Sequence, residues 1–131
     1  FSLSEVRLGI GPGAVSPYVV AAIGAREARR YFQTGERFDA AEALRIGLAH
    51  KVVAAPELDA ATDTLLAELA KSGPGATRAA KALIQAVEGK EIDGVVKRDT
   101  AQRIAQARAT GEGKEGLSAF LEKRKPNWIK G

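Results

Sequence analysis

Glycine and proline residues divide most of this chain into short helices, and this punctuation limits its possible folds more than any other feature. After residue 56, apolar residues recur at helical spacing between stop signals at 72–74, 89, 111–113 and 126. Earlier, Ser16-Pro17 is a typical helix start, and Gly24, Gly35 and Gly47 follow apolar runs. The pattern predicts helices over 16–23 and 25–34, a helix starting at Asp39, and only helices after about residue 56.

Two short stretches outside these helices have the pattern of strands. Phe1, Leu3 and Glu5 alternate with polar residues, and the apolar stretch Leu48–Val53 follows the glycine at 47. We therefore expect a mainly α protein with a short α/β part, in which residues 1–55 mix strand and helix and residues 56–131 are helical.

Composition narrows the classes of function. The 131 residues include no cysteine, one histidine and 5% aromatic residues, with a net charge of +4. Without cysteine the chain can form neither disulfides nor metal sites with thiolate ligands, and it has few aromatic residues for stacking on bases. We therefore expect no metal site, no nucleic-acid partner and a reducing, cytoplasmic setting. No segment approaches the length of a membrane span. The sequence has no methionine and starts at Phe1, so we expect the C-terminal part of a longer protein.

Glu5 is the strongest candidate for chemistry. A carboxylate on the apolar face of a short strand is costly unless it is paired or used, for example as a general acid or base. The alternative is a structural ion pair with Arg7, which would share its face. The turn Gly9-Ile10-Gly11-Pro12-Gly13 that follows could bring backbone close to a ligand, or could simply be a tight turn.

Two basic groups could bind phosphate. One is the arginine stripe at 26, 29 and 30, which is more often the solvated face of a helix. The other is the tail Glu122-Lys123-Arg124-Lys125, which precedes Pro126 and Trp128 and could hold a nucleotide phosphate near an aromatic ring.

Taken together, three segments resemble the C-terminal half of the enoyl-CoA hydratase/isomerase (crotonase) family. They are LSEVRLGIGPG, YFQTGERFDAAEALRIGLAHKVV and EGLSAFLEKRKPNW, and the second carries the pattern G-x-x-x-x-A-x-x-A-x-x-x-G-L that is typical of the family. The resemblance implies the C-terminal portion of the ClpP/crotonase-like spiral ββα fold: residues 1–55 would end the spiral core and residues 56–131 would form a helical oligomerisation region. The stretch SPYVVAAIGAREARRYF is most similar to the branch that hydrates methylglutaconyl-CoA and related branched, carboxylated enoyl-CoAs.

The resemblance also implies roles for particular residues. Glu5 matches the glutamate that protonates the α-carbon or shares the catalytic water, Gly13 matches the turn glycine that touches this water, and Lys123 matches a position that approaches the CoA phosphates. It implies an acyl-CoA thioester substrate, no separate cofactor because CoA is part of the substrate, and a homo-trimer or hexamer. The oxyanion-hole amides and a second glutamate belong to the family's N-terminal half, so we expect this chain alone to be inactive. Two alternatives stay open: an enoyl-CoA isomerase, or a non-catalytic oligomerisation fragment.

Overall fold

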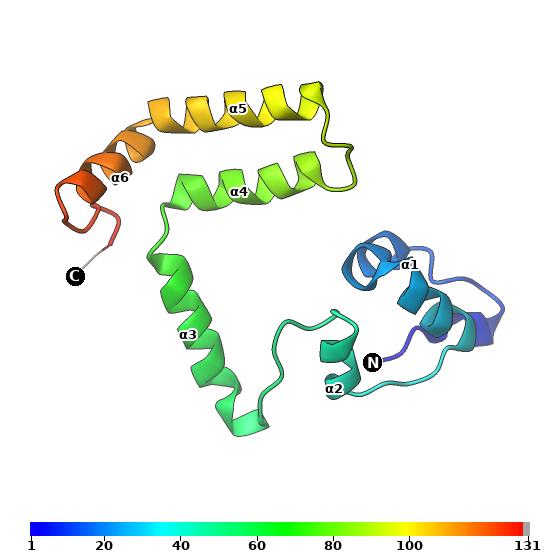
Figure 1. The fold of residues 1–131 in the computed structure, drawn as a ribbon. Helices are drawn as coiled ribbons and strands as arrows, with labels where there is room; N and C mark the ends of the chain where they lie inside the picture. The colour runs from blue at the N-terminus through cyan, green and yellow to red at the C-terminus, as the bar shows by residue number, and fades with distance from the viewer. Residues whose placement is uncertain (130–131) are drawn as a thin grey trace. The chain divides into compact units, whose positions relative to one another are not determined.

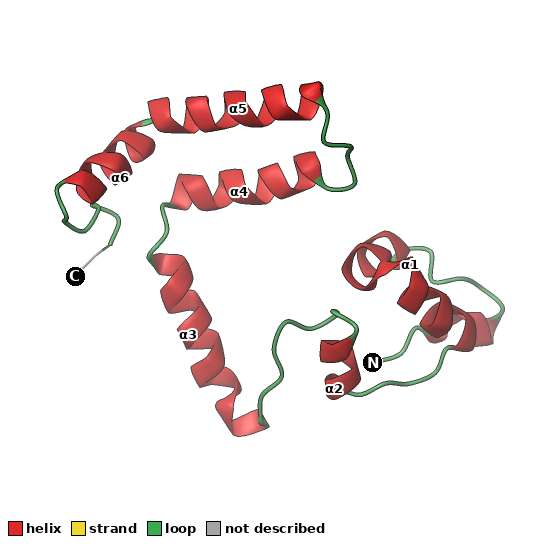
Figure 2. Cartoon of the chain, viewed as in Figure 1, coloured by secondary structure: helices red, strands yellow, loops and turns green. Residues whose placement is uncertain are grey.

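The computed structural model describes residues 1–129, and within them it contains helices and loops but no strand (Figure 2). The chain divides into two compact units, Phe1–Leu58 and Asp59–Gly131. Each unit is described by itself, with the element labels of Figure 1.

The first unit is built on one long, bent helix. It contains the 3-10 helix η1 (Ser4–Leu8), α1 (Ser16–Thr34), α2 (Ala40–Arg45) and the 3-10 turn η2 (Ala55–Glu57). Helix α1 is interrupted at Gly24, whose φ of 73° and ψ of 162° are not helical, so the two predicted segments 16–23 and 25–34 are confirmed as two helical pieces. Asp39 accepts a hydrogen bond from the Glu42 amide at 2.8 Å, which confirms the predicted start of α2.

The core of this unit is small and lies between α1 and the segment around α2. Its buried members are Ile23, Ala28, Tyr31 and Ile46, and partly buried side chains pack against them. The rings of Phe1 and Phe38 are stacked with centroids 5.5 Å apart, and Phe38 lies 4.4 Å from the Tyr31 ring. These contacts bring the start of the chain against the segment that follows α1.

The prediction of a short α/β part is wrong for the described residues. The stretch expected to be a strand around Glu5 is η1, whose end is closed by bonds from the Gly9 amide to Val6 O at 3.1 Å and from the Ile10 amide to Glu5 O at 3.3 Å. In the stretch 48–53, the amides of Leu48 and Ala49 both donate to Ala43 O. A strand needs a neighbour to pair its backbone, whereas the backbone groups named here are satisfied locally.

The described part of the second unit contains four helices: α3 (Leu58–Ala70), whose first residue still belongs to the first unit, α4 (Pro74–Val87), α5 (Gly94–Ala109) and α6 (Gly111–Leu121). Helices α4, α5 and α6 pack against one another. The glycine stop predicted at 111–113 also begins the next helix, because Thr110 Oγ1 accepts from the Gly113 amide at 2.9 Å. The Glu112 carboxylate accepts from the amides of Gly75 and Ala76 at 2.9 and 2.6 Å, which joins α6 to the start of α4.

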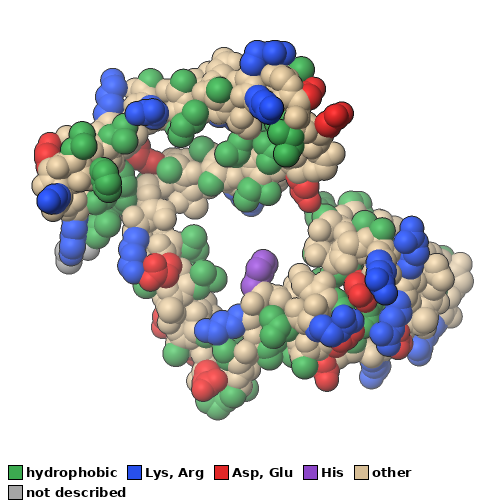
Figure 3. All heavy atoms as spheres, viewed as in Figure 1, with side chains coloured by type: hydrophobic (Ala, Val, Ile, Leu, Met, Phe, Trp, Pro, Cys, Tyr) green, Lys and Arg blue, Asp and Glu red, His purple; other side chains and the backbone are tan. Residues whose placement is uncertain are grey.

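The second unit buries very little. Among its described residues only Gly73 and Ala119 are buried, and apolar side chains are plainly visible on the surface of its helices (Figure 3). Its exposed large apolar residues are Leu65, Leu66, Leu69, Ile84, Ile92, Val95, Ile104, Leu117, Phe120 and Leu121. These helices therefore leave most of their apolar surface without a partner from their own unit.

Candidate functional site

Glu5 lies on η1, at the start of the first unit, and its side chain is half-buried. A 3-10 helix has three residues per turn, so residues three apart share a face. Ser4 and Arg7 share one face, Val6 lies on a second, and Glu5 shares the third with Leu8. Leu8, which shares the face of Glu5, is 79% exposed, whereas Glu5 itself is half-buried.

The alternative explanation of Glu5, an ion pair with Arg7, is not observed in the part of the chain that the structure describes. Arg7 is on a different face of η1, and it borders a shallow hollow together with Ser2, Ser4, Leu8 and Arg37. The regular strand that would have aligned the two side chains is absent from this segment, so the reason for expecting the pair is lost.

The glycine turn after η1 has one glycine that the backbone needs and two that it does not. Gly9 has a φ of 77°, which favours glycine. Gly11 and Gly13 have no positive φ, and an added Cβ at either position would meet no atom within 4 Å. Gly13 is exposed, and its carbonyl accepts from Ser16 Oγ at 2.9 Å. Without side chains, Gly11 and Gly13 leave their backbone accessible, so a ligand or a segment outside this unit can approach it closely.

Exposed apolar side chains follow Glu5 along the glycine turn and into α1. Leu8, Ile10, Val15 and Tyr18 are 38% to 79% exposed. They lie on η1, in the turn and at the start of α1. Exposed apolar side chains in the same segment as a carboxylate are the kind of surface that can line a site for an apolar ligand.

Lys123 lies in the second unit, whereas Glu5 and Gly13 lie in the first. It follows α6 with a φ of 54°, and it is the one non-glycine residue with a positive φ among the described residues. The amides of Lys123 and Arg124 donate to Phe120 O at 3.2 Å and to Ala119 O at 3.0 Å. These two bonds form a Schellman motif with lysine at the position that glycine usually occupies.

Neighbouring contacts hold Lys123 in this conformation. The Arg124 guanidinium bonds both oxygens of Glu115 at 2.7 and 3.0 Å, and it also bonds Glu122 at 2.6 Å. The pKa of Glu115 is lowered, first by the bonds from Arg124 and then by the Asn127 amide. Trp128 cannot offer its indole N–H to a ligand here because it donates to Lys71 O at 3.2 Å.

A second charged cluster, which sequence reasoning missed, has a structural role. The buried Tyr31 donates its hydroxyl to Glu42, and Arg45 donates to both oxygens of the same carboxylate at 2.6 Å. The bonds from Arg45, followed by the bond from Tyr31, lower the pKa of Glu42 to about 2. The bond to Glu42 is also the main cause that raises the pKa of Tyr31. Only the spacing of Glu42 and Arg45 on one helix could have indicated part of this cluster.

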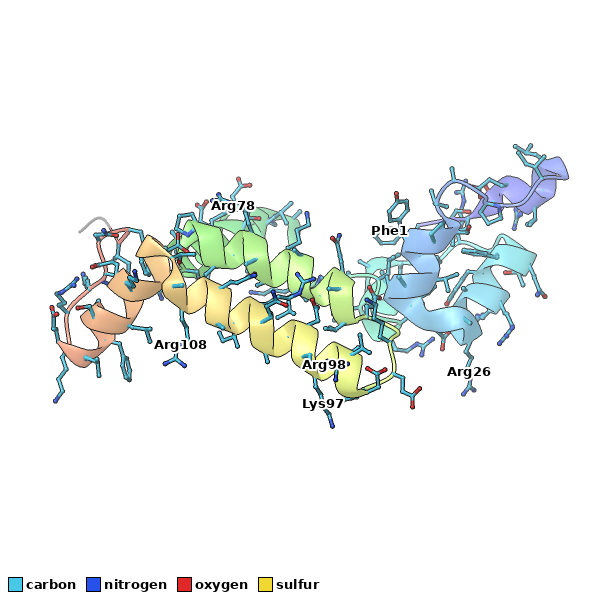
Figure 4. The ribbon with its side chains drawn as sticks, turned by 90° about the horizontal axis from the view of Figure 1, so that it is seen from above. Phe1, Arg26, Arg78, Lys97, Arg98 and Arg108 are labelled. Carbon is cyan, nitrogen blue, oxygen red and sulfur yellow. The ribbon has the colours of Figure 1, made fainter. Side chains whose placement is uncertain are left out.

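The arginine stripe of α1 behaves mainly as a solvated helix face. Arg26 and Arg29 are exposed, and Figure 4 shows Arg26 projecting outward from α1. Arg30 is paired with Glu36 at 2.6 Å, and its guanidinium lies 5.2 Å from the centre of the Tyr31 ring. The described residues contain no group of three or more His, Cys, Asp or Glu placed to hold a metal ion. No helix within the described part of the chain is both long and apolar enough to span a membrane.

Comparisons with known proteins agree on one family. The family described as enoyl-CoA hydratase/isomerase matches residues 1–131. A crotonyl-CoA hydratase of Syntrophomonas wolfei is 35% identical over 130 residues, covering 98% of this chain and 50% of the relative. A carnitinyl-CoA dehydratase of Proteus mirabilis is 30% identical over 140 residues, covering 98% of this chain and 51% of the relative. The chain thus spans about half the length of the curated relatives it matches.

Solved structures give the same result. The crystal structure of an enoyl-CoA hydratase from Shewanella pealeana matches with a TM-score of 0.93 and 44% identity, over 98% of this chain and 48% of that one. The protein AtuE of Pseudomonas aeruginosa matches with a TM-score of 0.91 and 42% identity, over 99% of this chain and 50% of that one. The helical arrangement described above is therefore one that these solved chains also contain.

Proposed function

Because the chain belongs to the enoyl-CoA hydratase/isomerase family, we propose that it supplies the acid–base residue Glu5 to an enoyl-CoA hydratase. The reaction adds water across the 2,3-double bond of an enoyl-CoA thioester, placing the hydroxyl on C3 and a proton on C2. The observation that carries the proposal is the position of Glu5: a half-buried carboxylate on η1 without the ion pair to Arg7, on a face beside an open glycine turn.

Glu5 acts by moving a proton at the carbon next to the thioester. As water adds at C3, Glu5 either gives its proton to C2 while a second acid–base group takes the proton that the water releases, or takes that proton while the second group protonates C2. General acid–base catalysis of this kind contributes roughly 10²–10⁴-fold to a rate. The partial burial of Glu5 suits this role, because a carboxyl group that is less hydrated transfers a proton to carbon more readily.

Two further residues have roles in this proposal. The exposed backbone of Gly13 contacts the reacting water, which explains a glycine at a position where neither φ nor crowding requires one. Lys123 pairs with a phosphate of the CoA moiety. A lysine held in a left-handed conformation fits this role, because strained backbone conformations of non-glycine residues often occur at functional sites.

The assembly and the acyl group are part of the same proposal. The exposed apolar faces of the second unit would be covered in a homo-trimer or hexamer. The preferred acyl group is branched or carboxylated, as in methylglutaconyl-CoA, which is supported by the resemblance of the stretch 16–32 to that branch.

The proposal is tested by replacing Glu5 with glutamine in the complete polypeptide that the gene encodes. We expect Glu5→Gln to reduce the hydration of crotonyl-CoA and of methylglutaconyl-CoA by at least 10²-fold, with an unchanged circular dichroism spectrum. Glu88→Gln, at the end of α4, is the matched control and should keep full activity. Retained hydration by a folded Glu5→Gln protein would refute the proposal. If the original protein converts a 3-enoyl-CoA but does not hydrate enoyl-CoA, it is an isomerase instead.

A further inference from the structure

The end of α1 touches the helix that carries Glu5. Gly35 is buried and has a φ of 58°. A methyl carbon added at Gly35 would lie 3.2 Å from Arg7 Nε, 3.3 Å from Val6 Cγ2 and 3.4 Å from Ser4 Cα. The first two distances are tighter than ordinary carbon contacts, so any side chain at this position would push against η1.

The contact continues along the backbone before Glu5. Phe1 and Phe38 exchange two backbone hydrogen bonds: Phe1 N donates to Phe38 O at 2.8 Å, and Phe38 N donates to Phe1 O at 3.1 Å. Ser2 Oγ also donates to Gly35 O at 3.4 Å. The segment 35–38 therefore holds the chain on the N-terminal side of Glu5, and Gly35 itself contacts η1.

These contacts involve two of the three faces of η1. Ser4 and Arg7 on one face, and Val6 on the second, meet Gly35. Glu5 is on the remaining face, which contributes none of these three nearest atoms. A shift of η1 away from Gly35 would therefore move the Glu5 carboxylate without breaking any bond that the carboxylate itself makes.

We propose that Gly35 is a positioning residue for the reaction: the absence of a side chain there lets η1 seat against the end of α1, and this seating fixes the direction of Glu5. The inference rests on the proposed role of Glu5. The inference predicts an effect beyond backbone strain. Gly89 has a similar φ of 68°, but an added Cβ there would meet no atom within 4 Å, so Gly89 lacks the contact that Gly35 makes with η1.

The experiment compares Gly35→Ala with Gly89→Ala in the complete polypeptide. Both changes put alanine at a positive φ, so both lower the unfolding midpoint. Gly35→Ala alone should reduce kcat about three- to tenfold with little change in KM, because η1 must give by a few tenths of an ångström and a full 1 Å at a reacting group costs about 100-fold. It should also speed hydrogen exchange of the Gly9 and Ile10 amides at least tenfold, because these amides close the end of η1.

A second pair of variants keeps the inference testable if Gly35→Ala does not fold. Val6→Ala removes the methyl group that faces Gly35, whereas Val19→Ala removes an equivalent group from α1 that packs on the core. Val6→Ala should lower kcat three- to tenfold and speed exchange at Gly9 and Ile10. Val19→Ala should lower stability by a similar amount and leave kcat unchanged.

The outcomes separate this inference from the proposed function. Full kcat in Gly35→Ala, or equal losses in Gly35→Ala and Gly89→Ala, would overturn the inference while Glu5→Gln still abolished hydration. If Gly35→Ala does not fold, unchanged kcat in Val6→Ala would overturn it. If Glu5→Gln keeps its activity, the proposed function fails. In that case, faster exchange at Gly9 and Ile10 in Gly35→Ala but not in Gly89→Ala would still support the seating of η1. Unchanged exchange in Gly35→Ala would refute it.

Discussion

Replacing Lys123 with glycine should stabilise the protein and weaken its binding of acyl-CoA. Lys123 has a φ of 54° at the position after α6 where glycine is common. A left-handed conformation costs an ordinary residue about 1–2 kcal/mol. Glycine avoids this cost but gains freedom in the unfolded chain, which offsets about 0.4–1 kcal/mol. The expected net gain is about 0.5–1 kcal/mol, or a rise of about 2–4 °C in the unfolding midpoint for a chain of this size.

The same change removes the charge that we assign to a CoA phosphate. A charge-assisted contact contributes about 1.5–3 kcal/mol, so KM for crotonyl-CoA should rise about tenfold or more. Crotonyl-pantetheine carries the same acyl group without any nucleotide phosphate. Its kcat/KM should be the same for the original protein and for Lys123→Gly, because the lost contact has no partner in this substrate.

Two control variants separate charge from conformation. Lys123→Arg keeps the charge and the strain, so both the midpoint and KM should stay near their original values. Lys125→Gly removes a neighbouring charge from a residue whose φ is not positive, so it should not stabilise the protein. An unchanged KM for crotonyl-CoA in Lys123→Gly would refute the phosphate contact, and an unchanged or lower midpoint would refute the argument from strain.

Two further predictions concern pH and assembly. Arg45 and Tyr31 lower the pKa of Glu42 from 4.5 to about 2, so its contribution to stability is complete above pH 4.5 and is lost as the pH falls toward 2. When unfolding by denaturant is measured at a series of pH values, Glu42→Gln should lose less stability over this window than the original protein does. Phe120 is 79% exposed on α6, so Phe120→Ser should reduce the oligomer measured by sedimentation if this face is an interface; an unchanged assembly would exclude Phe120 from the contact.

The sequence predicted the helices well because their ends depend on local chemistry. Gly24 interrupts α1 where the apolar run ends, and Asp39 caps α2 through its own side chain. The strands were predicted wrongly for a related reason. The alternation of Phe1, Leu3 and Glu5 describes which side chains share a face, but a strand also needs a neighbouring strand for its backbone, and η1 closes its own hydrogen bonds instead.

The candidate site was accessible from the sequence only in part. Glu5 stood out as a carboxylate among apolar residues, and the resemblance to a family gave it a proposed role. The contact of Gly35 with η1 could not be predicted, because the glycine looks like an ordinary helix stop and its neighbours are about 30 positions away in the sequence. The left-handed backbone of Lys123 was equally hidden, since lysine is not a residue that signals this conformation.

The uneven burial of the two units determines how these variants should be measured. The first unit has a small core around Tyr31, whereas the described part of the second unit buries only Gly73 and Ala119. Apolar burial is the main source of stability, at about 25 cal/mol per Å², so helices that bury so little gain little stability from their own unit. In the proposed assembly, the stability gained by Lys123→Gly after α6 would be linked to association, and the unfolding midpoint of this variant should then depend on protein concentration. The exchange of Gly9 and Ile10 reports a local contact within the first unit and should not show this dependence.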